Sequence, residues 1–332
     1  MRAMLSKEVG GPETLVLEEM QTPTPGKKQV VIRVHAAGVN FPDTLIIRDL
    51  YQLKPPRPFS PGGEVAGVIE AVGEGVDALA VGDRVLGMSG FGGFASHLVI
   101  DALRVIKIPD AMPFEDAACL MMTYGTSHHA LKDRAVLNEG ETLFILGAAG
   151  GVGAAAIELG KAAGARVIAG VSSEEKAAFC RELGADETLI YARDMTDRAL
   201  QKEFSGQIKK VSGGEGVDVV YDAVGGAYAE PCIRALAWTG RFLVVGFPAG
   251  IPKIPLNLTL LKGCQIMGVF WGAHTMREPR KHAENMGDLF RMYAAGQIKP
   301  RISARYPLEK AGDALKLLQD RKVLGKIVVT VT

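Results

Sequence analysis

The sequence of 332 residues has little of several features that would assign a function class at once. Its four cysteines (Cys119, Cys180, Cys232 and Cys264) stand dozens of residues apart and form no CxxC pair. That spacing argues against a four-cysteine zinc knuckle and gives no disulfide framework. Charge of one sign is not in excess either, because 38 Lys and Arg stand against 37 Asp and Glu. The basic excess of most nucleic-acid binders is therefore missing.

Long apolar runs are also missing. No stretch reaches about 18 uninterrupted apolar residues, so no membrane-spanning helix is predicted. The first residues, MRAMLSKEVGGPETL, carry charge but no apolar segment typical of a secretion signal. With the dispersed cysteines, this composition leads us to expect a soluble, cytoplasmic protein with reduced thiols. Hydrophobic residues make up 48 % and charged residues 23 %, and the length is typical of about two globular domains.

The residues up to about 122 predict a β-rich domain. Four segments alternate or run apolar between Gly and Pro breaks, at 29–39, 65–73, 82–88 and 94–101. They are typical of strands in a barrel or curled sheet. A proline-rich stretch (Pro55, Pro56, Pro58 and Pro61) predicts a long loop after the first strand, and loops of this length tend to be functional. From Pro113 the spacing becomes helical, and the helix leads out of the domain.

The middle of the chain alternates apolar strands with helices. The six strands are expected at 142–147, 166–171, 187–191, 217–225, 241–247 and 265–270. This alternation predicts an α/β fold with a parallel, doubly wound sheet of the Rossmann type. After two more helical patterns, a last strand at 326–332 has no helix behind it and must pair with an earlier part of the chain. We therefore predict a domain from 1–124 and 272–332, interrupted by a second domain at 125–271.

Glycine is in excess, at 40 of 332 residues, or about 12 % against a usual 7 %. Part of the excess lies in the loop GAAGGVG (147–153), between the first parallel strand and an Ala-rich helix. Glycines here permit a tight turn and let the backbone approach a pyrophosphate at the helix N-terminus. A purely structural turn is the alternative, but the five further strands favour dinucleotide binding. The loop residues Ala149, Gly150, Gly151 and Val152 are the predicted contacts.

The end of the second parallel strand bears on which dinucleotide binds. An Asp or Glu about 20 residues after the loop would bond the ribose 2′-hydroxyl of NAD. Here Ser172 and Ser173 follow the strand, and the first carboxylate, Glu174, is expected in the next helix. The two serines leave room for a 2′-phosphate, and Lys176 can supply positive charge, so NADPH is favoured. The alternative for Lys176 is a solvated helix residue.

Several motifs together resemble the medium-chain dehydrogenase/reductases, and within them the zeta-crystallin-like NADPH:quinone oxidoreductases. The matching segments span nearly the whole chain: AAGVNFPD (36–43), PGGEVAGVIEAVGEGV (61–76), GDRV (82–85), GAAGGVG (147–153), ELGAD (182–186), VVYDAVGG (219–226) and GKIVV (325–329). The resemblance implies a GroES-like catalytic domain interrupted by a Rossmann domain, which agrees with the insertion inferred above.

The residues also bear on zinc. Zinc-dependent relatives place a Cys and a His as metal ligands where this chain has Asn40 and Gly63. A catalytic zinc needs about three thiolate, imidazole or carboxylate ligands, so no such site and no other metal ligand is predicted. His128 and His129 are adjacent on a helix and face different sides, so each is expected to be a packing or polar-contact residue. Without a Lewis acid, hydride delivery to an already electrophilic acceptor remains, and a quinone fits.

The resemblance implies that Asn40 and Tyr51 lie near the nicotinamide, with Tyr51 as proton donor or orienting group. Asp43, in the same loop, is a third candidate catalytic residue. The alternatives are a loop aromatic for Tyr51 and a turn or capping residue for Asp43. Leu45 stands where bacterial relatives often have a second aromatic, so their substrate specificity does not carry over.

Further cofactor contacts are implied by matching motifs. They are Thr126 near the nicotinamide or phosphates, Tyr191 near the 2′-phosphate, Phe247, Phe270 and Trp271 around the carboxamide and acceptor pocket, and Lys326 at the phosphates. Each of these contacts has a structural alternative. Thr126 could instead bond its own helix backbone, and the three aromatic residues could pack in the core. Lys326 could be a solvated lysine at the edge of a sheet.

We therefore predict an NADPH-dependent oxidoreductase that transfers hydride to a quinone or similar conjugated carbonyl. A 2-enoyl thioester or enone reductase is the second functional hypothesis, because the enoyl-reductase branch uses a tyrosine in the Tyr51 region as proton donor. The hypothesis from a different functional class is a non-catalytic, crystallin-like or RNA-binding protein. The near-neutral net charge argues against RNA binding. The resemblance implies a homodimer through the edge of the parallel sheet, and the apolar sixth strand is an edge that needs covering.

Overall fold

The computed structural model describes residues 1–331 and divides the chain into two compact units. Unit 1 contains Met1–Met122 and Pro300–Thr332, and unit 2 contains Thr123–Lys299. The second boundary differs from the expected one at 272, because α9 (Trp271–Arg277) and α10 (Pro279–Ala294) group with unit 2. Their helical pattern shows an apolar face but not which sheet it covers, so the sequence could not decide their unit.

Unit 1 is built on antiparallel strands. Its strands are β1 (Arg2–Leu5), β2 (Val16–Glu19), β3 (Gln29–Val39), β4 (Glu64–Val72), β5 (Arg84–Met88), β6 (His97–Asp101), β7 (Val105–Lys107), β14 (Ile302–Pro307) and β15 (Lys326–Thr330). The main sheet has the order β14-β15-β3-β4-β5-β7, and β6 pairs with β3. The last strand, β15, pairs antiparallel with β3 and parallel with β14. The C-terminal strand thus lies in the same sheet as the N-terminal strands, as the sequence analysis expected.

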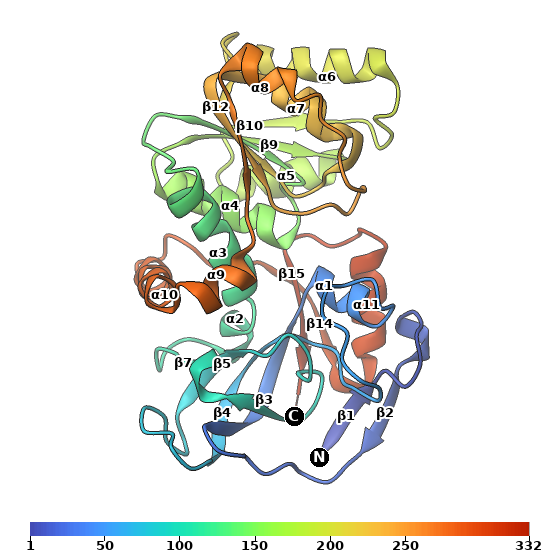
Figure 1. Ribbon diagram of the computed structural model, residues 1–332, viewed down its shortest axis with the longest axis vertical. Coiled ribbons are helices and arrows are strands. Elements are labelled where there is room, and N and C mark those ends of the chain that lie inside the picture. Colours follow the sequence, from blue (N-terminus) through green and yellow to red (C-terminus); the bar gives the residue numbers. More distant parts are fainter. Residues whose placement is uncertain (332) are drawn as a thin grey trace. The chain divides into compact units, whose positions relative to one another are not determined.

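Short helices cover this sheet. They are α1 (Phe41–Ile46), α2 (Phe114–Ala117), α11 (Ala311–Gln319) and the 3₁₀ turns η1 (Pro12–Thr14), η2 (Ala102–Arg104) and η5 (Leu308–Lys310). Figure 1 shows the C-terminal helix α11 beside α1, although almost 270 residues separate them in the chain. Buried aliphatic residues of β3, β4, α11 and β15 form one core in this unit. Helix α1, which the sequence analysis left as loop, occupies the start of the predicted long loop.

Unit 2 has the predicted parallel sheet. Its strands are β8 (Thr142–Leu146), β9 (Arg166–Val171), β10 (Glu187–Ile190), β11 (Val217–Asp222), β12 (Leu236–Val244) and β13 (Gln265–Gly268). Their order is β10-β9-β8-β11-β12-β13, with every pairing parallel. This is the doubly wound Rossmann order, in which the chain reverses direction across the sheet between β8 and β11. The central strands β8 and β9 are buried along almost their whole length, because helices cover both faces.

The helices of unit 2 follow the strands in turn. They are α4 (Gly151–Ala162), α5 (Glu174–Glu182), α6 (Arg198–Val211), η4 (Gly226–Tyr228), α7 (Ala229–Arg234) and α8 (Asn257–Lys262), followed by α9 and α10. Helix α4 packs on β8 and β9, α5 on β9 and β10, and α7 on β11 and β12 (Figure 1).

The single helix expected from Pro113 onward is instead interrupted. Pro113 is the N-cap of α2, a second helix, α3 (Met121–His128), begins four residues after α2 ends, and the chain then widens into a π-helical segment, η3 (His129–Arg134). π-helical turns are rare and frequently lie at functional sites. Among residues 1–331, no helix is both long enough and apolar enough to cross a membrane.

Candidate active site

Three polar side chains of unit 1 meet where three neighbouring strands begin or end. Asn40 follows β3, Glu64 begins β4 and Lys326 begins β15. Gly38 of β3 pairs with Glu64, and Val39 pairs with Ile327, the residue after Lys326. The antiparallel registers therefore bring residues from distant parts of the sequence to one point of the sheet.

These three side chains form a buried network. The Lys326 ammonium donates to Asn40 Oδ1 at 2.7 Å and to the Val39 carbonyl at 3.1 Å, and it lies 3.5 Å from Glu64 Oε2. Asn40 Nδ2 donates to Glu64 Oε2 at 2.9 Å and to the Gly38 carbonyl at 3.2 Å. The Lys326 and Glu64 side chains are only 4 % and 1 % exposed. A buried ion pair of this kind persists because hydrogen bonds satisfy both charged groups.

This placement corrects the alternative given for Lys326, a solvated edge lysine. Lys326 is not an exposed edge lysine, and its three N–H donors are directed at acceptors of unit 1, so we do not propose the expected contact with cofactor phosphates. The sequence analysis also missed Glu64 as a site residue. A charged residue at the buried start of a mostly apolar strand, EVAGVIEAV, was the signal that could have marked it.

Asp43 lies in the first turn of α1 and is 2 % exposed. Its Oδ2 accepts the backbone N–H of Asn40 at 2.8 Å, while its own N–H donates to the Asn40 carbonyl at 3.0 Å. Asp43 is therefore a capping residue, as the structural alternative expected. Burial raises the pKa of its carboxyl to about 7. Hydrogen bonds from the backbone N–H groups of Asn40 and Gly63 act in the opposite direction and lower this pKa, but burial has the larger effect.

Tyr51 is partly buried against the core of unit 1. Burial raises the pKa of its phenol, and the negative charge of Asp43 raises it further. The hydroxyl makes no hydrogen bond to another residue within 1–331, whereas both N–H groups of the Asn40 amide are occupied. Of the three predicted catalytic residues, Tyr51 is thus the one with an available donor.

The positions of the zinc ligands of related enzymes do not fit a metal here. Asn40 offers only an amide oxygen, which already accepts from Lys326, and Gly63 has no side chain. A Cβ on Gly63 would lie 3.1 Å from the backbone of Gly90, so the site has little room for a ligand side chain. The chemistry derived below therefore uses no zinc at these residues.

In unit 2, the glycine-rich loop lies between β8 and α4 as expected. Gly150 is the N-cap of α4 and has no side chain to cap the helix, so the N–H groups of Gly151, Val152 and Gly153 lack intrahelical partners. A Cβ on Gly153 would lie 2.4 Å from the Gly147 carbonyl oxygen, and therefore the turn requires glycine there. Open donors at a helix N-terminus fit a pyrophosphate.

The residues predicted at the ribose come together at the ends of β9 and β10. Ser173 is the N-cap of α5 and accepts the Lys176 N–H at 3.4 Å, and Lys176 Nζ donates to Ser172 Oγ at 3.3 Å. The backbone N–H of Tyr191 donates to Val171, which places Tyr191 beside these serines. Its ring packs edge-on against Phe204 and Tyr228 at 5.8 and 5.1 Å. The cluster has one positive charge and two hydroxyls, with Glu174 the first residue of α5 as expected.

The remaining predicted contacts differ in exposure. Thr126 is buried on α3, and Trp271 is buried at the start of α9, where its indole lies against Gly125. Phe247 and Phe270 are 47 % and 65 % exposed, so the core-packing alternative fails for both, whereas Trp271 is buried. Exposed rings at strand ends are available to contact a ligand.

Asp222 ends β11 and was not singled out from the sequence. It is buried, and its Oδ1 accepts the N–H groups of Val224 and Gly225 at 2.9 and 2.8 Å. Burial raises the pKa of this carboxyl to about 6, although the two N–H groups lower it. The motif VVYDAVGG could have marked it, because a carboxylate at the carboxyl end of a buried parallel strand needs such partners.

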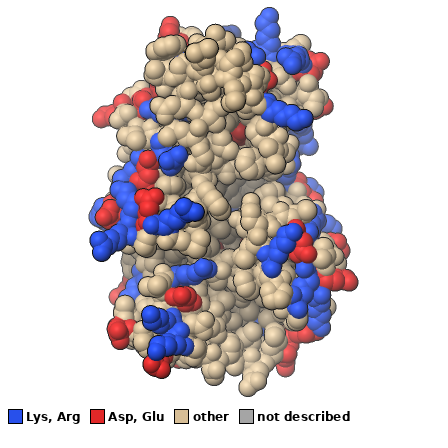
Figure 2. Space-filling model, in the orientation of Figure 1, with Lys and Arg blue, Asp and Glu red and all other residues tan. Residues whose placement is uncertain are grey.

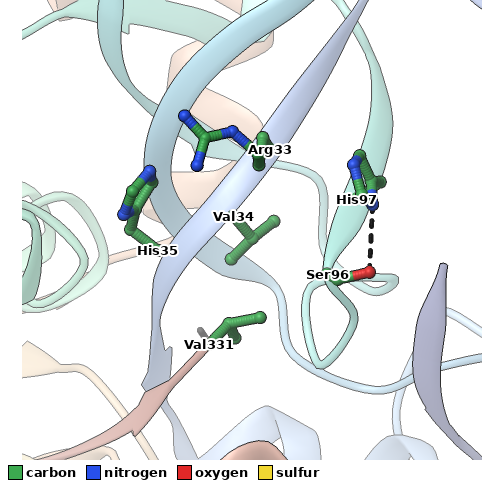
Figure 3. A pocket seen from close by; sticks show the side chains of 6 residues that line it. All are labelled: Arg33, Val34, His35, Ser96, His97 and Val331. Carbon is green, nitrogen blue, oxygen red and sulfur yellow. Dashed lines mark hydrogen bonds between the residues drawn. The ribbon is translucent and has the colours of Figure 1, made fainter.

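A pocket of about 360 Å³ lies elsewhere on unit 1 and contains none of the predicted site residues. Arg33, Val34 and His35 of β3 line it together with Ser96, His97 and Val331, and Figure 3 shows the Ser96 and His97 hydrogen bond at one side. The His35 ring stacks on Phe114, with centroids 4.5 Å apart. This pocket is separate from the Asn40 network.

Two family models match the chain. Residues 26–110 match the alcohol dehydrogenase GroES-like domain, and residues 151–285 match the model described as zinc-binding dehydrogenase. A quinone oxidoreductase-like protein 2 homolog from Nematostella vectensis is 37 % identical over 332 residues, covering 99 % of this chain and 88 % of that protein. Human quinone oxidoreductase is 32 % identical, with 99 % and 97 % covered.

Solved structures agree with these relatives. A mycobacterial protein in complex with NADPH superposes with a TM-score of 0.90 at 31 % identity, covering 99 % of this chain and 100 % of that one. The CurK enoyl reductase superposes with a TM-score of 0.87 at 28 % identity, covering 100 % and 99 %. The two units and the matches along nearly the whole chain show that the protein belongs to the medium-chain dehydrogenase/reductase family, among the zeta-crystallin-like quinone oxidoreductases.

Proposed function

We propose that the protein is an NADPH-dependent reductase that transfers hydride to a quinone or a similar conjugated carbonyl. The observation that carries this proposal is the cluster of Ser172, Ser173 and Lys176 beside the glycine-rich start of α4. A 2′-phosphate carries about two negative charges, which one ammonium and two hydroxyls complement, whereas NADH would leave Lys176 without an anionic partner in the ligand. The mycobacterial structural relative complexed with NADPH supports the same choice.

In unit 2, we assign pyrophosphate binding to the N–H groups of residues 151–153 and 2′-phosphate binding to the Lys176 cluster. When bound, the dihydronicotinamide supplies two electrons and one proton as a hydride. Reduction of a quinone then needs one further proton to give the hydroquinone. Thr126, Tyr191, Phe247, Phe270 and Trp271 remain proposed contacts along the cofactor.

In unit 1, we assign the donor to the acceptor's oxygen to Tyr51. Its phenol keeps its proton at neutral pH, since burial and Asp43 raise its pKa, and its hydroxyl has no other partner among residues 1–331. A hydrogen bond from a neutral phenol stabilises negative charge that develops on a carbonyl oxygen. Asn40 and Asp43 are positioning residues, because their polar atoms are engaged with Lys326, Glu64 and the backbone.

A second candidate is a 2-enoyl thioester or enone reductase, which the structural likeness to the CurK enoyl reductase favours. NADPH oxidation with 1,4-benzoquinone or a naphthoquinone, compared with a crotonyl thioester, distinguishes the two. Quinone turnover supports the first proposal, and robust enoyl reduction without quinone turnover replaces it with the second. A Tyr51→Phe loss confined to enoyl substrates would support the second candidate.

RNA binding finds less support in the charge distribution. On the face in Figure 2, Lys and Arg are interspersed with Asp and Glu, and the whole sequence has a formal net charge of +1. Nucleic-acid binders rely on a concentration of positive charge to neutralise phosphates. We therefore propose a small-molecule acceptor as the partner of the site.

We also propose that two copies pair through β13. This strand is at one edge of the unit 2 sheet, with β12 as its neighbour. The backbone N–H and C=O groups on the open side of an edge strand are unpaired and need to be covered. Apolar side chains are exposed on and near it: Trp238, Leu260, Leu261 and Ile266. Light scattering should give a molar mass of about twice 35.3 kDa for the wild type. The double variant Leu260→Lys, Leu261→Lys should give the mass of a single chain. Leu103→Lys, at an exposed leucine of unit 1, is the matched control, and a monomeric wild type would overturn the proposal.

A further inference from the structure

Unit 2 holds a second group of chemically active side chains, apart from the nucleotide loop. His129 and Asp133 lie on the π-helical segment η3, and His274 lies on α9. One ligand-capable atom from each of the three lies within 4.8 Å of the others. The two histidines are buried and Asp133 is partly buried. Two imidazoles and a carboxylate whose donor atoms lie this close together are a ligand set of Zn²⁺ sites.

The contacts within the cluster are specific. His129 Nδ1 lies 2.9 Å from Asp133 Oδ2, and His274 Nε2 lies 3.9 Å from the same oxygen. The rings of His129 and His274 stack with centroids 3.9 Å apart and planes inclined by 16°. Asn285 of α10 donates to Asp133 Oδ2 at 2.7 Å and fixes the orientation of that carboxylate. All four residues belong to unit 2, so its own fold defines the cluster.

His274 gives an independent indication of a missing ligand. It is 5 % exposed, and neither ring nitrogen has a hydrogen-bond partner among the described residues. The Glu278 carboxylate lies 3.5 Å from Nδ1 but does not form a hydrogen bond with it. An imidazole has two polar nitrogens, and burying one of them without a partner is unfavourable. A bound cation at Nε2 would satisfy one nitrogen.

The geometry needs only a small adjustment to hold an ion. Ligands about 2.0–2.2 Å from a tetrahedral Zn²⁺ lie roughly 3.3–3.6 Å from one another. The distance from Asp133 Oδ2 to His129 Nδ1 is already shorter than that range, and the distance to His274 Nε2 is slightly longer. A modest rotation of the His274 ring out of its stack with His129 would bring the donors together. Lys281 Nζ lies 3.9 Å from the other oxygen, Asp133 Oδ1, so on the Oδ2 side the cation would share the carboxylate only with the Asn285 amide.

We propose that His129, Asp133 and His274 bind one divalent transition-metal ion, Zn²⁺ by preference, with water as a fourth ligand. Imidazole and carboxylate donors suit Zn²⁺ among the metals available in cells. The ion would connect η3 to α9 and thereby stabilise unit 2, since binding to the folded state alone adds to its stability. No step of the proposed hydride transfer passes through this ion.

The test is metal binding to the full chain after treatment with a chelator. Equilibrium dialysis with Zn²⁺ should give one ion per chain for the wild type, and Co²⁺ should give visible absorption bands of a four-coordinate site. Loss of one ligand in His274→Ala should weaken Zn²⁺ binding at least tenfold and remove those bands. His97→Ala, on a histidine of unit 1, is the matched control and should bind like the wild type.

Thermal unfolding gives a second readout that does not depend on enzyme activity. Zn²⁺ should raise the Tm of the wild type and of His97→Ala but not that of His129→Gln, which keeps an amide able to bond Asp133. If His274→Ala does not fold, His129→Gln decides the matter by the same dialysis. Equal Zn²⁺ binding by wild type and both cluster variants, or no binding by the wild type, would overturn the proposal and leave a histidine pair hydrated by water.

Discussion

Lys326 and Glu64 form an ion pair inside unit 1, at 3.5 Å, although 262 residues separate them in the chain. The pair joins the first residue of β15 to the first residue of β4, and the Asn40 amide bridges the two charges. Because both groups are almost fully buried, neither can turn to water when the other is removed. The pair therefore couples the C-terminal strand to the loop that carries Tyr51.

The first prediction concerns this pair. Lys326→Met should lower the free energy of unfolding by about 3–5 kcal/mol, since it leaves a buried carboxylate without its cation. Glu64→Gln should lower it by a similar amount, and the double variant by clearly less than the sum, because neither charge is then orphaned. Urea unfolding of the four proteins measures this coupling. Strictly additive losses would contradict the role of the ion pair.

The second prediction concerns pH and Asp43. Its pKa of about 7 in the folded protein lies above the unfolded value of 3.8, so the folded state holds the proton more tightly. The stability from this group is complete below about pH 4 and is lost as the pH rises towards 7. Asp43→Asn should flatten this part of the stability curve, while Asp222→Asn should flatten only the part up to about pH 6. Wild-type slopes in both variants would contradict these values.

The third prediction concerns the turn before α4. Gly153→Ala places a Cβ 2.4 Å from the Gly147 carbonyl oxygen and 2.7 Å from Ala148 Cα, both backbone atoms that cannot rotate away. The turn must shift, so NADPH affinity should fall at least tenfold, with about 1–3 kcal/mol of stability lost. Gly206→Ala on α6 has nothing within 4 Å of its Cβ and should instead stabilise the protein by about 0.5–1 kcal/mol. Calorimetric titration with NADPH reads out the effect, and an unchanged affinity in Gly153→Ala would be inconsistent with this loop binding the pyrophosphate.

The fourth prediction concerns the choice of cofactor. Lys176→Ala should raise the KM for NADPH about tenfold, or roughly 1.4 kcal/mol, through loss of one charge-assisted hydrogen bond. The KM for NADH should change little, because NADH has no 2′-phosphate. Lys202→Ala, at an exposed lysine of α6, is the control for loss of a surface charge. Equal changes in the KM for NADPH and for NADH would show that Lys176 does not bind the 2′-phosphate.

The elements most open to sequence analysis were those with strong local patterns. The six parallel strands were predicted within a few residues, because each contains a short apolar run, and β3 was predicted at 29–39 without error. The glycine-rich loop before α4 was predicted equally well, and in the structure Gly153 of this loop has no room for a Cβ. Local pattern and tertiary structure agree at these places.

Long-range pairings were the part that the sequence could not reveal. Lys326 was predicted to contact the cofactor phosphates, with a solvated edge lysine as the alternative, because nothing near it in the chain shows that β15 pairs with β3 and meets Glu64. His129 was compared with its neighbour His128, whereas its partners are Asp133, four residues on, and His274, in a different helix. The boundary at Lys299 was missed for the same reason, since it depends on which core α10 covers.

The central claim is hydride transfer from NADPH to a quinone, and a single-turnover measurement tests it most directly. Enzyme loaded with NADPH, either unlabelled or carrying deuterium at the transferred C4 position, is mixed anaerobically with a naphthoquinone and, separately, with a crotonyl thioester. The account predicts NADPH oxidation by the quinone, one hydroquinone per NADPH, with slower oxidation of the deuterated cofactor. NADPH that stays reduced with the quinone but is oxidised by the crotonyl thioester would contradict it.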